Sequence, residues 1–197
     1  QVATVEMAGS DSVWVCHLSM LKDTVTVPLS HFVEELEMVI LDNRDAALVS
    51  PSKTIIGKQY ILVYKMGHVP FKLFTKSGTY LRDIGSFGQG AGEYGLVYDA
   101  QMDEENNRLY VLCWQADHIL VFDLQGNILQ PIRLAHWSPK GIFHVETERG
   151  RVHVCALSFN RDFVGDRHSP MIWTQSLDGK IIKELPAGPL AVNDYGN

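Results

Sequence analysis

The chain has 197 residues and a formal net charge of -6 at pH 7; 46% of its residues are hydrophobic and 20% are charged. This composition is typical of a folded domain with a sizeable core, and it excludes a disordered chain. Lysine and arginine form no basic stripe, which argues against a nucleic acid partner, and no apolar run approaches the ~18 residues that a transmembrane helix needs.

The first residue is Gln1 rather than methionine, which indicates that the numbered chain starts after a removed leader or at an artificial boundary. Three cysteines, Cys16, Cys113 and Cys155, form an odd set without CxxC spacing. This pattern fits neither a zinc site nor a disulfide framework, so we expect small, buried core residues. A disulfide between Cys113 and Cys155 is the alternative.

The N-terminal part mixes strand and helix signals. Residues 13–18 and 24–27 are rich in β-branched and aromatic side chains and predict two short strands. In residues 28–37, Leu29, Phe32, Val33 and Leu36 share one helical face, and Ser30 is a suitable N-cap. We therefore expect a helix of about two turns there, followed by a strand at 38–41.

From residue 48 onward the sequence repeats. Apolar strands at 59–63, 108–112 and 151–155 each follow a turn signal, and each is followed by a second strand and a tight turn with glycine. The turn glycines Gly78, Gly126 and Gly179 recur at intervals of about 50 residues, a period typical of a β-propeller blade with four short strands.

The predicted fold is therefore all-β: a β-propeller of four-stranded antiparallel blades, about three of them, with a short N-terminal helix. We expect the N-terminal strands and helix in 1–47, the first blade and a crossover loop in 48–95, the second blade in 96–140, and the third blade with the start of the next inter-blade loop in 141–197. The expected strands, from the centre outward, are 48–56, 60–65, 69–74 and 79–84; then 97–102, 108–113, 118–123 and 128–134; then 141–147, 151–157, 171–176 and 181–185.

A glycine-rich loop separates the first two blades and contains Gly85, Gly88, Gly90, Gly92, Glu93 and Tyr94. Phosphate-binding loops lead from a strand into a helix, whereas a strand follows here and no Gly-Lys-Ser/Thr is present. We interpret the loop as a structural crossover between blades. Glu93 and Tyr94 are expected to tie it to a neighbouring blade.

Ligand recognition is expected on the face where the second-to-third strand turns and the inter-blade connections lie. Loops tolerate insertion and often carry function, and the third blade has a long connection at 158–170. Aromatic and basic residues on these loops are our candidate ligand-binding residues, with core packing between blades as the alternative for the tryptophans: Trp114, Trp137, Trp173, Arg161, Arg167 and His168.

Metal and catalytic motifs are weak in this sequence. His136, His144 and His153 lack the spacing of a metal site, although His144 and His153 can approach one another across a hairpin. No nucleophile elbow is present, so we assign neither catalytic residues nor a metal site and expect no cofactor. Calcium remains possible through oxygen ligands, and the candidates are Asp99, Asp103, Glu104, Asn106, Asn107, Asp162 and Asp166.

The Pro-Leu-Ser segment at Pro28, the glycine motif from Gly85 to Tyr94 and the run from Asp103 to Val111 resemble the six-bladed β-propeller proteins of Bacteroidetes, which are NHL-like and TolB-like. Ala91 stands where that family commonly has proline. The resemblance implies a periplasmic or cell-surface protein, which is either secreted or lipid-anchored through its full-length precursor, and no common catalytic motif.

We therefore expect a non-enzymatic propeller that binds a glycan, a peptide or a protein through its inter-blade and second-to-third strand loops. The alternative is a calcium-dependent hydrolase of the lactonase type. Three blades are half of a six-bladed ring, so either the chain is part of a longer protein or a homodimer completes the propeller.

Overall fold

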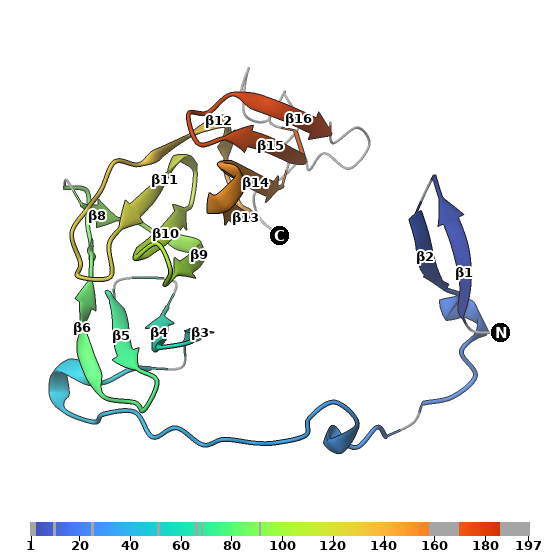
Figure 1. Ribbon diagram of the computed structural model, residues 1–197, viewed down its shortest axis with the longest axis horizontal. Coiled ribbons are helices and arrows are strands. Elements are labelled where there is room, and N and C mark those ends of the chain that lie inside the picture. Colours follow the sequence, from blue (N-terminus) through green and yellow to red (C-terminus); the bar gives the residue numbers. More distant parts are fainter. Residues whose placement is uncertain are drawn as a thin grey trace. The chain divides into compact units, whose positions relative to one another are not determined.

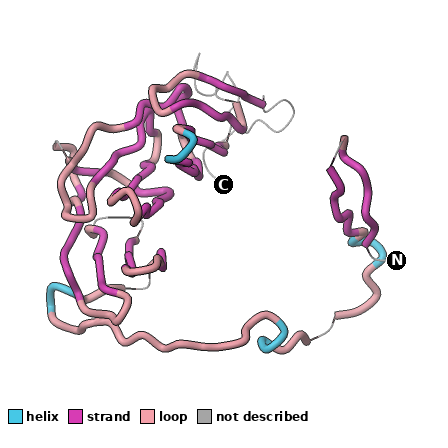
Figure 2. The backbone as a smooth tube through the Cα atoms, in the orientation of Figure 1, coloured by secondary structure: helices cyan, strands magenta, loops and turns pink. Residues whose placement is uncertain are grey.

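A computed structural model describes residues 3–9, 11–24, 26–50, 52–65, 67, 69–90, 92–157 and 170–185. The chain divides into two compact units, Gln1–Met38 and Val39–Asn197, and each is described by itself. The longest regular elements among the described residues of both units are strands, and the helical segments are single 3-10 turns (Figure 2).

The N-terminal unit contains one antiparallel hairpin of β1 (Ala3–Ala8) and β2 (Asp11–Cys16), in which Val5 lies opposite Trp14. Two 3-10 turns follow, η1 (Leu18–Met20) and η2 (Leu29–His31). The hairpin confirms a strand in the expected region, although it ends at Cys16 rather than at residue 18.

The helix expected at 28–37 is absent, and this prediction was wrong. Only η2 forms there, and the apolar side chains that were to share its face, Leu29, Phe32 and Leu36, are largely exposed. A helix of two turns is not stable in water unless its apolar face packs against other residues. The strands expected at 24–27 and 38–41 are also absent among the described residues, which form no ladder there.

The second unit contains three four-stranded antiparallel sheets, each with its strands in chain order. The first sheet has β3 (Lys53–Ile56), β4 (Tyr60–Tyr64), β5 (Phe71–Thr75) and β6 (Tyr80–Ile84). The second has β9 (Val97–Asp103), β10 (Arg108–Cys113), β11 (Ala116–Phe122) and β12 (Ile132–Ser138). The third has β13 (Gly141–Glu146), β14 (Arg151–Ala156), β15 (Ile172–Ser176) and β16 (Ile181–Leu185).

Short elements complete this unit. The parallel pair β7 (Ser86–Phe87) and β8 (Glu93–Tyr94) lies in the connection between the first and second sheets. Two 3-10 turns, η3 (Asp45–Ala47) and η4 (Thr147–Arg149), precede β3 and β14. The expectation of an all-β fold is thus confirmed, with sheets that are mostly antiparallel, and the strand boundaries agree within a few residues for most of the twelve strands.

The three sheets pack face to face in chain order, with β3, β9 and β13 on one side of the stack and β6, β12 and β16 on the other (Figure 1). One apolar core fills the space between the first two sheets, with Leu62, Phe71 and Phe122 among its buried residues. A second core joins the second and third sheets and includes Leu112 and Trp173, both with no exposed surface. The two middle strands of the second sheet, β10 and β11, therefore contribute alternate residues to the two cores.

The outer face of the first sheet is covered by residues 39–47, which we name the strap. Its Val39, Leu41 and Ala47 pack on Ile61, Val63 and Phe74 of the sheet. The Asp42 amide donates to the Gly78 carbonyl at 2.8 Å, and the Lys72 ammonium donates to the Ala46 carbonyl at 2.6 Å. These two polar contacts hold the strap on the sheet.

The largest boundary difference concerns β12, which we expected at 128–134 and which spans Ile132–Ser138. Pro131 has no N–H and cannot donate to the neighbouring strand. Ile128 forms only an isolated bridge with Phe122, and the regular ladder begins after the proline, where Ile132 pairs with Ile119.

Candidate binding surface

The turns and connections expected to carry recognition lie together at one end of the second unit. The Trp114 amide, in the β10–β11 turn, donates to the Leu96 carbonyl before β9 at 2.7 Å. The next amide, that of Gln115, donates to the Pro139 carbonyl between β12 and β13 at 3.1 Å. This turn therefore contacts the entries to both the second and the third sheet, and we name this end of the sheets the connection end.

Trp114 and Trp137 flank this turn. The Trp114 side chain is 44% exposed at the tip of the turn. Trp137 lies in β12 rather than in the connection after it, and its indole Nε1 donates to the Gln115 carbonyl at 3.1 Å. Trp114 thus exposes its indole to solvent, whereas Trp137 stabilises the turn that carries Trp114.

The turn has a strained backbone. Gln115 has φ +54°, a left-handed conformation that a side chain with a Cβ rarely adopts and that glycine or asparagine usually occupies. The contacts from Gln115 to Pro139 and Trp137 hold this conformation. Strain of this kind persists only where the surroundings fix it, and it is concentrated at functional sites.

Other apolar side chains are exposed in the connections of this unit. Val69 precedes β5, Phe87 lies in β7 and Leu157 follows β14, and each is exposed like Trp114. Each belongs to a different connection at the same end of the strands. Of the candidate binding residues, Arg161, Arg167 and His168 lie outside the described residues, as do Asp162 and Asp166, whereas Trp173 is fully buried in the second core.

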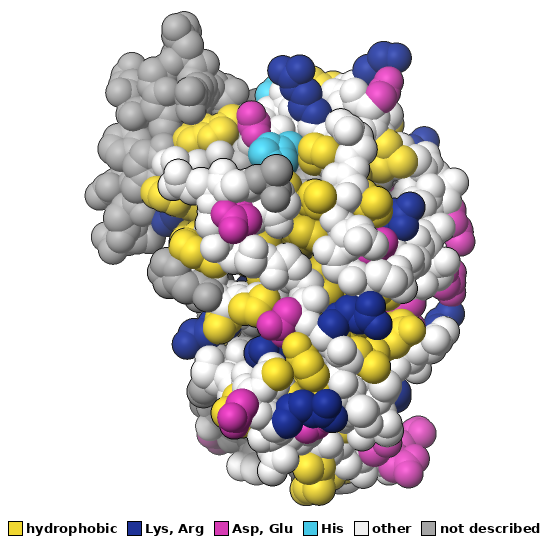
Figure 3. Space-filling model, turned by 90° about the vertical axis from the view of Figure 1, so that its left-hand side faces the viewer, with side chains coloured by type: hydrophobic (Ala, Val, Ile, Leu, Met, Phe, Trp, Pro, Cys, Tyr) yellow, Lys and Arg dark blue, Asp and Glu magenta, His cyan; other side chains and the backbone are white. Residues whose placement is uncertain are grey.

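Charged groups are scattered over the side of the molecule that carries β6 and β8. In Figure 3, lysine and arginine side chains alternate with acidic and hydrophobic ones, and they form no continuous stripe on the face shown.

Glu93 stabilises the glycine-rich loop through contacts inside the loop itself. Its Oε2 accepts a hydrogen bond from the Gly90 amide at 2.8 Å, and a Cβ added at Gly88 would lie 1.9 Å from the same oxygen. The Gly88 amide donates to the Tyr94 carbonyl at 3.0 Å. Both glycine amides are therefore engaged inside the loop, and Glu93 contacts its own loop rather than the neighbouring sheet that we expected it to reach.

Tyr94 makes the contact between sheets. Its hydroxyl accepts a hydrogen bond from the Phe71 amide at 3.1 Å and donates to the Val69 carbonyl at 3.2 Å. Its ring packs edge-on against Phe71 of the first sheet and Phe122 of the second, with centroid distances of 5.3 and 6.3 Å. Burial raises the pKa of the Tyr94 hydroxyl above its ordinary value, so this group stays a neutral donor and acceptor.

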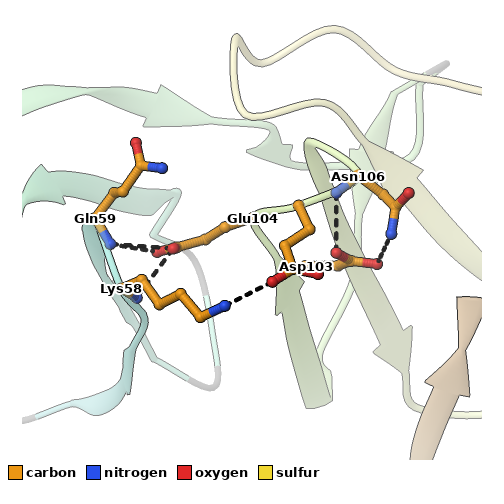
Figure 4. A network of polar contacts seen from close by, with 6 residues as sticks. Lys58, Gln59, Asp103, Glu104 and Asn106 are labelled. Carbon is orange, nitrogen blue, oxygen red and sulfur yellow. Dashed lines mark hydrogen bonds and ion pairs between the residues drawn. The ribbon is translucent and has the colours of Figure 1, made fainter.

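The acidic residues considered as calcium ligands lie mainly at the opposite end of the strands, in the β9–β10 turn (Figure 4). The Glu104 carboxylate accepts hydrogen bonds from the amides of Lys58, Gln59 and Tyr60, at 2.9, 3.0 and 2.9 Å. The neighbouring Glu105 forms an exposed ion pair with Lys58 at 2.6 Å. Glu104 thus binds the β3–β4 turn to the second sheet.

Asp103 serves its own turn and the third sheet. Its carboxylate accepts hydrogen bonds from the Asn106 amide at 3.0 Å and from the Thr147 hydroxyl at 2.8 Å. Burial opposes ionisation of this carboxyl, but the hydrogen bonds from Asn106 and Thr147 outweigh it and lower the pKa of Asp103. In the described part of the chain, no group of three or more histidine, cysteine or acidic side chains is arranged to hold a metal ion.

A ladder of side-chain hydrogen bonds joins β9 to β13. The Asp99 carboxylate accepts from the Phe143 amide at 2.9 Å, and the Gln101 side chain accepts from the Val145 amide at 2.7 Å and donates to its carbonyl at 2.9 Å. Asp103 adds the Thr147 contact at the end of the same face. The role of Gln101 was not predicted from the sequence, although polar residues at every second position of a strand indicate one polar face.

His136, His144 and His153 have structural partners. His144 and His153 are cross-strand neighbours, as expected, and their rings stack with centroids 6.3 Å apart. His136 Nε2 lies 2.9 Å from a Glu184 carboxylate oxygen, and its ring packs edge-on against Trp173.

The cysteines differ from expectation. All three are free; Cys16 and Cys155 are exposed and Cys113 is partly buried, with a thiol pKa that burial raises. The prediction of buried core cysteines was wrong for Cys16 and Cys155, because both lie on strand faces that no other element in the described residues covers.

The comparisons with known proteins identify a family. The family described as "Domain of unknown function (DUF4934)" matches residues 14–195. The chain belongs to this family. None of the curated proteins matches this DUF4934 chain. In the described residues, no helix has the length and apolar character needed to cross a membrane.

Solved structures are similar to this DUF4934 chain, and one of them supports its fold. A crystal structure of a "putative exported protein" from Bacteroides fragilis aligns with a TM-score of 0.61 at 20% identity, covering 77% of this chain and 42% of that chain. A protein of unknown function from Bacteroides caccae aligns with a TM-score of 0.47 at 14% identity, covering 64% of this chain and 45% of that chain. The DUF4934 chain thus spans less than half the length of either protein.

Proposed function

We propose that this DUF4934 chain is a non-enzymatic recognition protein of the bacterial cell envelope, which binds a glycan, a peptide or a protein at its connection end. We further propose that its three sheets are blades of a β-propeller of the NHL-like or TolB-like kind. Export to the periplasm or cell surface is part of the proposal, and the name of the Bacteroides fragilis protein supports it.

The propeller proposal is supported by the way the sheets repeat. Each is a four-stranded meander, and the first strands β3, β9 and β13 lie on one side of the stack (Figure 1). Side chains of one first strand bond to the backbone of the next, as Lys53 does to the Tyr98 carbonyl at 3.3 Å and Asp99 to the Phe143 amide at 2.9 Å. In a propeller, every blade packs on the next in the same way, so this repeated contact between successive sheets supports the proposal.

The observation that carries the recognition proposal is the presentation of Trp114. A half-exposed indole stands on a two-residue turn whose strained backbone is clamped by contacts to Pro139 and Trp137. Tryptophan offers a large flat surface that stacks on sugar rings and aromatic or aliphatic side chains, and rigid presentation lowers the entropic cost of binding.

A calcium-dependent hydrolase of the lactonase type is the second candidate. It needs several free oxygen ligands, whereas the carboxylates of Asp99, Asp103 and Glu104 each accept hydrogen bonds from a neighbouring sheet. Because these contacts hold the sheets together, we favour binding over hydrolysis for this chain.

Glycan and peptide arrays test the proposal, followed by calorimetry on the ligands that bind. Trp114→Ala should weaken binding by at least ~10-fold, about 1.4 kcal/mol, because the stacking surface is lost. Trp14→Ala is the matched control, since Trp14 is even more exposed but lies in the N-terminal hairpin. Equal affinities of the two variants would refute recognition through the turn, and calcium-dependent lactone hydrolysis that a chelator abolishes would refute a non-enzymatic role.

A further inference from the structure

In the described part of the chain, one face of the third sheet is buried and the other is not covered. Phe143, Val145, Val152, Val154 and Trp173 point into the core shared with the second sheet. The alternate residues point the other way, and they form a cross-strand row of Ile142, Cys155, Ile172 and Leu185 over all four strands. Each of the four strands contributes one side chain to this row. Of the three large apolar side chains, Ile142 is 61% exposed, Ile172 37% and Leu185 47%.

The same positions in the other two sheets are buried. Cys155 lies opposite Ile142, as Leu112 lies opposite Asp99 and Tyr64 lies opposite Lys53. Leu112 has no exposed surface and Tyr64 has 6%, because the second and third sheets cover them. Cys155 is exposed although it occupies the equivalent position.

The first strands repeat the pattern. Lys53 of β3 and Asp99 of β9 each bond to the backbone of the following sheet, at Tyr98 and Phe143. Ile142 is the equivalent residue of β13, and His144 and Glu146 extend the same face, where Gln101 and Asp103 of β9 make their contacts with the third sheet. The open face of the third sheet therefore resembles the face of the first sheet that packs on the second sheet and the face of the second sheet that packs on the third.

We propose that this open face is the docking surface for a fourth four-stranded antiparallel sheet, supplied by the same polypeptide outside residues 1–197. Its first strand runs beside β13, where His144 and Glu146 meet its backbone, and its apolar side chains cover the row centred on Cys155. The inference rests on the proposed stacking of blades but not on the recognition role, so a failed binding assay leaves it standing.

Two observations favour the same polypeptide over a second copy of this chain. A second copy that continued the stack would have to present the outer face of its first sheet, where the strap already buries Ile61, Val63 and Phe74. In addition, the Bacteroides fragilis protein with the same fold is more than twice as long as its aligned part.

Thiol labelling tests the proposal, because Cys155 lies in the middle of the proposed interface. The natural polypeptide is purified under native conditions and treated with a maleimide, and labelling of each cysteine is followed by peptide mass spectrometry. We expect Cys155 to react at least ~100-fold more slowly than the exposed Cys16, at every protein concentration, because a covered thiol reacts only when the interface opens. Both cysteines should react alike in denaturant.

Two results would overturn the proposal. Labelling of Cys155 as fast as Cys16 means that nothing covers the face, and protection that disappears on dilution means that a second copy covers it. Ile172→Glu, next to Cys155, should accelerate Cys155 labelling at least ~10-fold by placing a charge in the apolar interface, whereas Ile128→Glu, in the β11–β12 connection, should leave it unchanged. Equal effects of the two substitutions would also count against the proposal.

Discussion

Replacement of Tyr94 by phenylalanine tests whether one hydroxyl joins the glycine loop to the first sheet. The substitution keeps the ring between Phe71 and Phe122 but removes the acceptor of the Phe71 amide and the donor to the Val69 carbonyl. The side chain is 1% exposed, so water cannot replace the lost partner. An unpaired buried amide costs about 1–3 kcal/mol, and we expect a loss near 2 kcal/mol in the free energy of unfolding.

Urea unfolding followed by tryptophan fluorescence measures this loss, and it corresponds to a fall in Tm of about 4–8 °C for a domain of this size. Tyr80→Phe is the matched control, because its hydroxyl donates to the Asp83 carboxylate in a more exposed place and should cost less than about 1 kcal/mol. Amide hydrogen exchange at Phe71 should accelerate only in Tyr94→Phe. Equal losses in both variants, with unchanged exchange at Phe71, would refute the reasoning.

Three further predictions concern the turns. Glu104→Gln should destabilise the second unit by about 2 kcal/mol, because an amide cannot accept from three backbone N–H groups, and Glu105→Gln, which removes only an exposed ion pair, by less than about 0.5 kcal/mol in the same urea assay. Gln115 has φ +54°, which glycine adopts readily and a β-branched residue does not. Gln115→Gly should therefore leave stability unchanged or raise it by up to about 1 kcal/mol, whereas Gln115→Val should lower it. A higher Tm for the valine variant than for the glycine variant would contradict this. The pKa of Asp103 is lowered in the folded state, since its hydrogen bonds outweigh the effect of burial. The contribution of Asp103 to stability is therefore complete above the unfolded pKa of about 4 and is lost as the pH falls through the folded pKa. Asp103→Asn should flatten the acid limb of a stability–pH curve, and an unaltered limb would contradict the assignment.

The sequence predicted the sheets well because their signals are local. Turn residues such as Gly126 and Gly179 and the runs of alternating apolar residues depend on neighbouring positions only, and β16 agrees with its expected bounds at both ends. The strand at β12 was misplaced because apolar residues on both sides of Pro131 favour a strand equally. Because Pro131 has no N–H to donate, the regular ladder begins only after it, at Ile132.

The contacts between sheets were less predictable, since they join residues that are 44 to 46 positions apart. Gln101 and Glu104 bond to the backbone of neighbouring sheets, and nothing in their local sequence identifies those partners. The helix at 28–37 failed for a related reason: periodicity indicated an apolar face for Phe32 and Leu36, but not whether another element would cover it. At the connection end, Trp114 and Trp137 were recognised by residue type, whereas the clamp through Gln115 depends on the folded turn.

The ladder between β9 and β13 has a consequence for how such chains diverge. Asp99 and Gln101 bond to the amides and carbonyl of Phe143 and Val145, not to their side chains. The polar part of the junction therefore excludes only proline at the two donating positions of the following strand, which must otherwise be extended and correctly spaced. Neighbouring sheets can thus drift in sequence, or be duplicated and exchanged during evolution, as long as each first strand keeps its own alternating polar side chains.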